Sequence, residues 1–406
     1  VNAGKVYNVT NTNELSEIRG NQVTVIATSG NIENIGGKIK GIESVVLSAE
    51  NGDVINSSSK SQSKEYYGSR NNTEHESILS VGSIESEGTT YIEGKNYISE
   101  AGIVTGKNTI IDAKENITIG SITLTGQDKS GISDDNYMTY NSTRKVGSEV
   151  SGTDSVILNA GNNINVKGSM VASDGVVQMT AENINIVNEK ESVKRDKKST
   201  DDGFMSTHSV EEKSYQEGAV GSTIVGNNVI LDAKNDINVK ASNVIALKDQ
   251  ENMGGNIIAT AGNNINILAD TLDNSYSRKE KSSGFSTNFS ADGGGLTAGV
   301  SYNKNSLEQT SNGTTVAVST LMSEGSTLLD AGNKIRTEAM QANIGEDLII
   351  KGKNGVELLD AKETYEDKTK QKSSSIGITA SIGSTVTSFV SSADDVLGNN
   401  GKYGFD

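Results

Sequence analysis

The sequence predicts an all-β fold, a parallel β-helix built as a solenoid of ~21-residue coils with protruding β-hairpins. Three observations predict it. A strand, corner, strand motif recurs along the chain; the apolar residues are mostly Val and Ile, which favour strands; and Pro, which removes a ladder donor, is absent. Hydrophobic residues make up 33% and aromatic residues 4% of the 406 residues, too few for two thick globular cores. A thin core repeated along an axis fits this composition.

Two alternatives accompany this interpretation. Low hydrophobicity and a net charge of −16 are also typical of disordered chains, but here the apolar residues are grouped rather than scattered. The abundance of Asn, Lys and Ile indicates an AT-rich genome, which would account for part of the missing Pro. With no Cys in the chain, disulfide staples and thiolate chemistry are excluded. The chain must therefore be held together by backbone pairing and burial.

The clearest copy of the motif runs from Val156 to Val166 and reads VILNAGNNINV. Val156, Leu158 and Ala160 alternate with other residues, which places them on one face of a strand. Gly and Asn then form a corner, because both tolerate positive φ, and a second alternating strand follows. Since the corner has about three residues, the chain turns as one coil of a solenoid does. Further copies begin at Thr109, Val229, Ile257, Thr327 and Leu348, with looser copies over 45–55 and 177–186.

The spacing between copies gives the length of a coil. Leu158 and the equivalent Met179 are 21 residues apart, which is enough for three short strands and three corners. Stacked coils would lie about 4.8 Å apart, with like residues above like. Asn recurs at one corner, where it either forms a ladder of amide hydrogen bonds along the axis or merely suits a turn. The Asn residues concerned are Asn162, Asn235, Asn263, Asn333 and Asn354.

The second position of the motif is apolar although alternation points it away from the core. An exposed apolar row would be adhesive, so we expect segments that leave the solenoid to cover it. The row consists of Ile110, Ile157, Ile230, Ile258, Leu328 and Ile349.

Such segments are present as polar excursions that read as extended β-hairpins. We expect a repeat domain over residues 1–384, with hairpins at about 57–80, 126–154, 187–222, 270–326 and from 361 onwards.

The C-terminal extension, residues 385–406, predicts a short helix. Apolar residues share one face at helical spacing, and Gly398 would end the helix. This helix would cap the last coil, which a solenoid needs for solubility; the alternative is a membrane-seeking segment. The apolar residues are Val386, Phe389, Val390, Ala393 and Leu397.

Four sequence runs resemble a known family. The cores AGNNINV and DAKNDINV, the run VGSTIVGNNVILDAK at 220–234 and the run DAKETYEDKTKQKSSSIGITASIG at 360–383 resemble the haemagglutinin repeats of filamentous haemagglutinins and contact-dependent growth inhibition exoproteins. The resemblance implies a right-handed β-helix with hairpins, on large proteins exported by two-partner secretion. The hairpin-bearing repeats are most similar to the second, membrane-distal repeat block of the growth-inhibition effectors. That block implies contact with a target outer membrane and passage of a C-terminal toxin into the periplasm.

Three parts of such exoproteins are not seen in this sequence: the N-terminal secretion domain, a VENN motif and a toxin domain. The chain also lacks an initiating Met and a signal segment, so it is expected to be an internal fragment. Delivery is therefore implied by the resemblance alone.

Catalytic chemistry is poorly represented, although some parallel β-helices cleave polysaccharides with clustered carboxylates. The acid pairs lie in the excursions, in turn-like contexts, and so do the two widely separated histidines, His75 and His208. We therefore predict that the segment is not an enzyme and has no catalytic residues. The pairs are Asp134–Asp135, Asp201–Asp202 and Asp394–Asp395.

Cofactor and metal motifs are equally weak. The triplet Gly293–Gly295 lacks the Lys and Ser/Thr of a phosphate-binding loop and reads as a hairpin bend, and the calcium-binding string GGxGxD is absent. We predict no cofactor and no structural metal. One basic cluster is more typical of a solvated hairpin arm than of an anionic-lipid site, because acidic residues interleave it. It comprises Lys190, Lys194, Arg195, Lys197 and Lys198.

The leading functional hypothesis is a structural and interaction module in contact-dependent toxin delivery across a target outer membrane. The alternatives are an adhesin shaft that binds host glycans or proteins and, more remotely, a polysaccharide-degrading enzyme. Expected partners are the two-partner secretion transporter, through a region outside this chain, and the target-cell outer membrane or a surface receptor. Net negative charge argues against nucleic acid, and no small-molecule substrate is expected. The expected location is secreted, at the cell surface of a Gram-negative bacterium.

Overall fold

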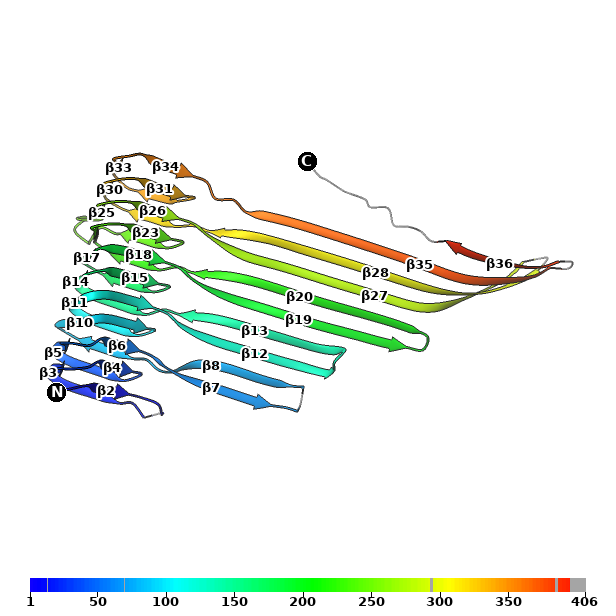
Figure 1. The fold of residues 1–406 in the computed structure, drawn as a ribbon, viewed down its shortest axis with the longest axis horizontal. Coiled ribbons are helices and arrows are strands. Elements are labelled where there is room, and N and C mark those ends of the chain that lie inside the picture. Colours follow the sequence, from blue (N-terminus) through cyan, green and yellow to red (C-terminus); the bar gives the residue numbers. More distant parts are fainter. Residues whose placement is uncertain (13, 69, 293–294, 384–385, 395–406) are drawn as a thin grey trace.

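The computed structural model describes residues 1–12, 14–68, 70–292, 295–383 and 386–394 (Figure 1). Every regular element in these ranges is a β-strand, as the all-β prediction requires. The strands form one 26-stranded sheet, whose ladders are parallel, and one antiparallel sheet of ten strands. Since there is no helix in the described parts of the chain, none of them holds a helical membrane span.

The parallel sheet winds into a stem of stacked coils, each made of three strands that belong to three columns. The first column contains residues 17–20 of β3 (Glu17–Ala27), 38–41 of β5 (Lys38–Ala49), β9 (Ser83–Ser86), 103–106 of β11 (Ile103–Gly120), 149–152 of β14 (Glu149–Ala160), β16 (Met170–Ser173), β21 (Thr223–Gly226), β24 (Asn243–Ala246), β29 (Thr320–Ser323) and β32 (Gln341–Ile344).

The second column corresponds to the first strand of the sequence motif. It contains β1 (Asn2–Ala3), the later parts of β3, β5 and β14, residues 89–94 of β10 (Thr89–Glu100), 108–113 of β11, β17 (Val176–Ala181), β22 (Asn228–Ala233), β25 (Ile257–Ala261), β30 (Thr327–Ala331) and β33 (Leu348–Gly352).

The third column corresponds to the second strand of the motif. It contains β2 (Val6–Val9), β4 (Ile32–Ile35), β6 (Val54–Ser57), residues 96–100 of β10, 116–120 of β11, β15 (Asn163–Lys167), β18 (Asn183–Val187), β23 (Ile237–Lys240), β26 (Ile265–Leu268), β31 (Ile335–Glu338) and β34 (Val356–Leu359).

The core runs along the axis of the stem because inward residues stack in register. Leu158 pairs with Met179 in the next coil, and Met179 pairs with Leu231 in the coil after that. These side chains are at most 2% exposed and belong to one continuous apolar cluster. A coil therefore buries its apolar side chains only together with its neighbours.

Asparagine amides form a ladder along the corner, so the ladder alternative of the sequence analysis is confirmed. Asn354 donates to Asn333 at 2.8 Å, and Asn235 donates to Asn183 at 2.9 Å. One position differs from the prediction: Asn163, rather than Asn162, donates along the axis, reaching Asn116 at 2.8 Å. At Asn162 the backbone N–H, rather than the side chain, bonds along the axis, donating to the carbonyl oxygen of Glu115.

The expected cover over the apolar second-position row is absent from the described residues, so that prediction was wrong. Ile258 remains 39% and Ile349 43% exposed. The hairpins pair only with one another and leave the stem away from this row, which lies on the second column (Figure 1). The row is half-buried because its members stack on each other in register, as Ile110 does on Ile157.

In the described residues, the hairpins all leave the stem at one corner, after a third-column strand, and all but the last return into the next first-column strand. Their ten strands lie side by side and form the antiparallel sheet, called here the hairpin sheet (Figure 1). The hairpins are β7 (Ser59–Tyr66) with β8 (Asn72–Ser80), β12 (Ile122–Ser133) with β13 (Asn136–Val146), β19 (Glu189–Gly203) with β20 (Ser206–Val220), β27 (Asp270–Asp292) with β28 (Gly295–Ala317), and β35 (Thr364–Gly383) with β36 (Val386–Asp394).

Two predicted excursions have different bounds in the structure. The one expected at 126–154 is a hairpin over 122–146, because residues 149–152 already pair as the first strand of the next coil. The one expected at 270–326 ends at Ala317, since residues 320–323 also return to the stem.

The predicted C-terminal helix is also wrong where it is described. Residues 386–394 form strand β36, which pairs antiparallel with β35, for example through Ile378 and Ser391. Val, Thr, Ser and Phe are weak helix formers, and the free edge of β35 offers backbone partners that a helix could not use. Leu397 and Gly398 lie outside the described residues.

Along the described stem, the corner between the third and first columns is occupied alternately by a hairpin and by a short turn, which we call a plain corner. Each plain corner has one residue at positive φ, whereas at the corners between them the chain extends into a hairpin. The residues at positive φ in plain corners are Gly36, Ala101, Gly168, Ala241 and Ala339.

Strand spacing explains this alternation. A hairpin leaves at the height of one coil and returns at the height of the next, so it occupies two levels about 4.8 Å apart. The next hairpin must start one level higher to continue the same sheet. If hairpins left from successive coils, the returning strand of one and the outgoing strand of the next would start at the same height. One hairpin for every two coils is therefore the period that gives a continuous sheet.

Candidate interaction surface

The carboxylate pairs considered in the sequence analysis lie apart on different hairpins, and cations pair with the first of them. Asp134 follows β12, and its Oδ1 lies 3.4 Å from Nη2 of Arg70. Asp135 pairs with Lys198 of the neighbouring hairpin. Asp201 and Asp202 are successive residues of β19, so they point to opposite faces of the hairpin sheet.

The remaining candidates are equally dispersed. His75 lies 2.8 Å from Asp128, and His208 lies 3.9 Å from Glu280 on a different hairpin. Asp394 is the last residue of β36, and Asp395 lies outside the described residues. Two of the three glycines of the GGG triplet also lie outside them. Across the described ranges, no group of three or more His, Asp or Glu side chains could hold a metal ion.

The predicted basic cluster lies on β19, and two of its members connect neighbouring hairpins. Lys190 donates to Glu217 of β20 at 3.0 Å and to the carbonyl of Thr271 in β27 at 2.6 Å. The backbone N–H of Asp273 and then the Lys190 ammonium hold the pKa of Glu217 below its ordinary value. The cluster thus helps to align hairpins.

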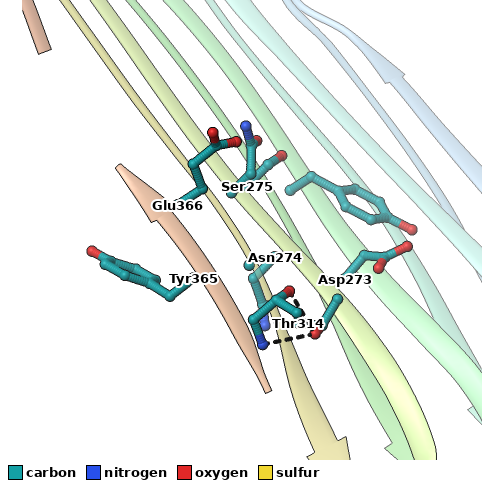
Figure 2. Close-up of a pocket in the computed structure, with 10 residues that line it drawn as sticks. Asp273, Asn274, Ser275, Thr314, Tyr365 and Glu366 are labelled. Atoms are coloured by element: carbon teal, nitrogen blue, oxygen red, sulfur yellow. Dashed lines mark hydrogen bonds between the residues drawn. The ribbon is translucent and has the colours of Figure 1, made fainter. Parts of the chain in front are cut away.

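A shallow depression of about 420 Å³ lies near the base of the hairpin sheet (Figure 2). Gly313 contributes to it by having no side chain: a Cβ there would lie 2.6 Å from the carbonyl oxygen of Thr364. Tyr365, which is 76% exposed, and the polar groups of Asp273 and Asn274 line the depression. An aromatic ring beside carboxylate and amide groups offers both stacking and hydrogen bonds to a ligand.

The distal part of the longest hairpins has one apolar face. Residues opposite each other in a ladder share a face, and the register aligns Phe285 with Tyr302 and Tyr302 with Ile376. Alternation extends this face toward the tip. We call its apolar members the apolar field: Phe285, Phe289, Ala291, Leu296, Ala298, Val300, Tyr302, Ile376, Ile378 and Ala380.

The apolar field is open to solvent, and the other face of the same strands is polar. Phe289 is 79% and Leu296 65% exposed, while the rings of Phe285 and Tyr302 contact each other in a tilted arrangement with their centroids 4.9 Å apart. The opposite face carries Ser, Thr, Asn and Gly, as in the aligned pair Ser286 and Ser301. Exposed apolar patches of several hundred Å² mark interaction sites.

Sequence reasoning missed this surface although its signal was present. The string FSTNF at 285–289 and the string IGITA at 376–380 alternate apolar and small polar residues, as a two-faced strand does. The sequence could not predict the strand register that aligns these two strings in neighbouring hairpins. The pattern was interpreted only as part of a generic hairpin.

Comparison with known proteins agrees with the architecture. The family model described as "Hemagglutinin repeat" matches residues 130–203, 203–306 and 300–400. The chain is 25% identical over 327 residues to the tRNA nuclease CdiA-2 of Burkholderia pseudomallei, which covers 75% of this chain and 10% of that protein. It is 28% identical over 260 residues to the 16S rRNA endonuclease CdiA of Enterobacter cloacae, covering 60% of this chain and 7% of that protein. No solved structure matches the chain.

Proposed function

Because the chain belongs to the hemagglutinin-repeat family of filamentous haemagglutinin-like exoproteins, we propose that it serves in contact-dependent delivery of a toxin across a target outer membrane. The chain is then a repeat segment of a secreted, surface-associated Gram-negative exoprotein. An outer-membrane transporter exports that exoprotein and recognises a region of it outside this segment. The stem acts as a spacer, and the hairpin sheet meets the target cell. The two relatives are much longer than this segment and are named as nucleases.

The stem in this proposal is a right-handed parallel β-helix. Parallel strands of one sheet are connected with right-handed crossovers in about 98% of cases, because that hand fits the strand twist. The ladders from coil to coil are parallel in all three columns.

The apolar field is the observation that carries the proposal. Ten uncharged residues separate Lys281 from Asp292 along β27, and strands of about 9 to 11 residues match the hydrocarbon thickness of a bilayer. On the face of the apolar field, three of the five residues in this stretch are apolar and exposed: Phe285, Phe289 and Ala291. A soluble shaft gains nothing from such a surface, whereas a membrane-contacting module requires one.

We further propose that the segment has no catalytic role. Its candidate carboxylates do not face each other across a groove: Asp134 is paired with Arg70, and Asp201 and Asp202 point to opposite faces of the hairpin sheet. Incubating the purified segment with bacterial and host polysaccharides and measuring released reducing ends tests this. Steady release above a buffer control would overturn it.

An adhesin shaft remains the second candidate, favoured by the depression with Tyr365. Its polar and aromatic lining is suited to a glycan better than to a membrane. A glycan array with the wild-type segment and a Tyr365→Ala variant separates the two functions. Binding that disappears with the tyrosine would support the adhesin role.

The delivery proposal is tested with three substitutions in the apolar field of the full-length exoprotein: Phe285→Ser, Val300→Ser and Ile378→Ser. Each removes an exposed apolar side chain from a different strand and retains the ladder. We expect normal secretion, little association with target-cell outer membranes, and growth inhibition reduced at least tenfold.

The matched control places three substitutions on the opposite face: Asn288→Ser, Ser301→Thr and Thr379→Ser. These change the same strands without changing apolar area, so they should leave inhibition unchanged. If the apolar-field variant still associates with membranes and inhibits as wild type does, the hairpin sheet is not the delivery surface.

A further inference from the structure

We propose that the apolar field continues into a band of lysines that binds the phosphates of anionic lipid headgroups. This inference rests on the proposed function and specifies the chemistry of the partner. The lysine band consists of exposed side chains from the three longest strands, β27, β28 and β35: Lys279, Lys281, Lys304, Lys368, Lys370 and Lys372.

Register places the lysine band and the apolar field on one face. Lys281 precedes Phe285 by four residues, Lys304 follows Tyr302 by two, and Lys372 precedes Ile376 by four. Even separations within a strand keep side chains on the same face. Since Phe285, Tyr302 and Ile376 are aligned, the three lysines border the apolar field, at about 7 to 13 Å along the strands.

The opposite face of the same strands lacks this charge. Between residues 277–291, 296–310 and 368–380, the lysine face carries six lysines and one acid, Glu308. The other face carries one cation and one acid, Arg278 and Glu280, which pair with each other at 3.0 Å. The positive charge is therefore confined to the face that also carries the apolar field.

The central lysines are free to bind a ligand. Two outer members of the band have acidic partners: Lys279 lies 3.3 Å from Glu308, and Lys368 lies 2.8 Å from Glu366, so part of their charge is neutralised. In the part of the chain that the structure describes, Lys281, Lys304 and Lys372 have no carboxylate within ion-pair distance. Lysines held for fold stability would have such partners, as Lys190 has in Glu217.

Charge and hydrophobicity together identify the occupant. Nucleic acid would use the lysines and leave the apolar field in water, and the net charge of −16 opposes it. A second copy stacked face to face would cover the apolar field but bring one lysine band toward another positive edge. An anionic lipid surface offers phosphates to the lysines and acyl chains to the apolar field at once.

The test measures partition of the whole 406-residue chain onto vesicles of phosphatidylcholine alone and of phosphatidylcholine with 30% phosphatidylglycerol. The variant carries Lys281→Gln, Lys304→Gln and Lys372→Gln. The control carries Lys5→Gln, Lys351→Gln and Lys353→Gln, exposed stem lysines that remove the same net charge. A lysine near an anionic surface strengthens binding roughly fivefold, so the variant should lose about a hundredfold on anionic vesicles.

The outcomes separate this inference from the proposed function. Preference for anionic vesicles that disappears in the variant, persists in the control and weakens in 0.5 M salt supports the lysine band. Equal binding of variant and control overturns it while leaving membrane contact intact. Binding to neither vesicle overturns both proposals. Sedimentation as a dimer that the apolar-field substitutions abolish assigns the face to a second copy and also overturns the inference.

Discussion

The stem and the hairpin sheet are both built from alternating strands, but they use the two faces of those strands in opposite ways. In the stem, each inner coil buries alternate side chains against the coils above and below, and residues such as Val156 and Leu158 are fully inaccessible. In the hairpin sheet both faces meet solvent, and Phe289 is 79% exposed. The difference shows that the stem supplies the stability of the molecule, so that the hairpin sheet, fixed at its base, is free to present a contact surface.

The largest effect is expected from breaking the stem core. Leu231→Asp buries a carboxylate where the side chain is 2% exposed, and an unpaired buried charge costs several kcal/mol. That is comparable to the stability of a whole domain. We expect limited proteolysis to cut near this coil and the melting temperature to fall. An unchanged protease pattern would mean that neighbouring coils do not depend on one another's burial.

Much of the division into a buried stem and exposed hairpins could be predicted from the sequence. The motif around Val156 and Leu158 gave the stacked coils, because burial on one face imposes a period of two that survives in any single chain. The hairpin ranges were approximate, since residues 149–152 pair with another coil and nothing local reveals that. The apolar field required the register between β27, β28 and β35, which depends on how far each hairpin rises from the stem.

A smaller effect is expected at the plain corners. Ala241 has φ of +44°, a region that costs a residue with a Cβ about 1–2 kcal/mol. Ala241→Gly removes that strain and should stabilise the stem by roughly 1 kcal/mol after the entropy of glycine is counted. Thermal unfolding of the variant, with Gly168 already serving as the natural example, measures it. Destabilisation would show that the methyl group, rather than the corner conformation, matters.

The smallest effect is expected at the base of the hairpin sheet. Glu217 accepts from the Asp273 N–H at 3.0 Å, and its pKa is lowered from 4.5. A lowered pKa in the folded state means that its stabilisation is present above pH 4.5 and is lost as pH falls through the folded value. Hydrogen-exchange protection of the Asp273 amide should therefore drop with acid. In Glu217→Gln it should be lower at pH 7 and nearly independent of pH between 7 and 3.

We infer that the stem positions the hairpin sheet by giving each hairpin two coils. Deleting residues 223–242 removes one coil without a hairpin, so β20 and β27 would start at the same height. Deleting residues 223–319 removes two coils and one hairpin, which preserves the period. Hydrogen exchange mapped by mass spectrometry distinguishes stem amides from hairpin amides in both variants.

We expect protected stem amides in both deletions. After the one-coil deletion, protection should be lost in β20 and β27, including the aligned pair Ser214 and Tyr276. After the two-coil deletion, the remaining hairpins should stay protected. Full protection of β20 and β27 after the one-coil deletion would contradict the claim that coil spacing builds the hairpin sheet.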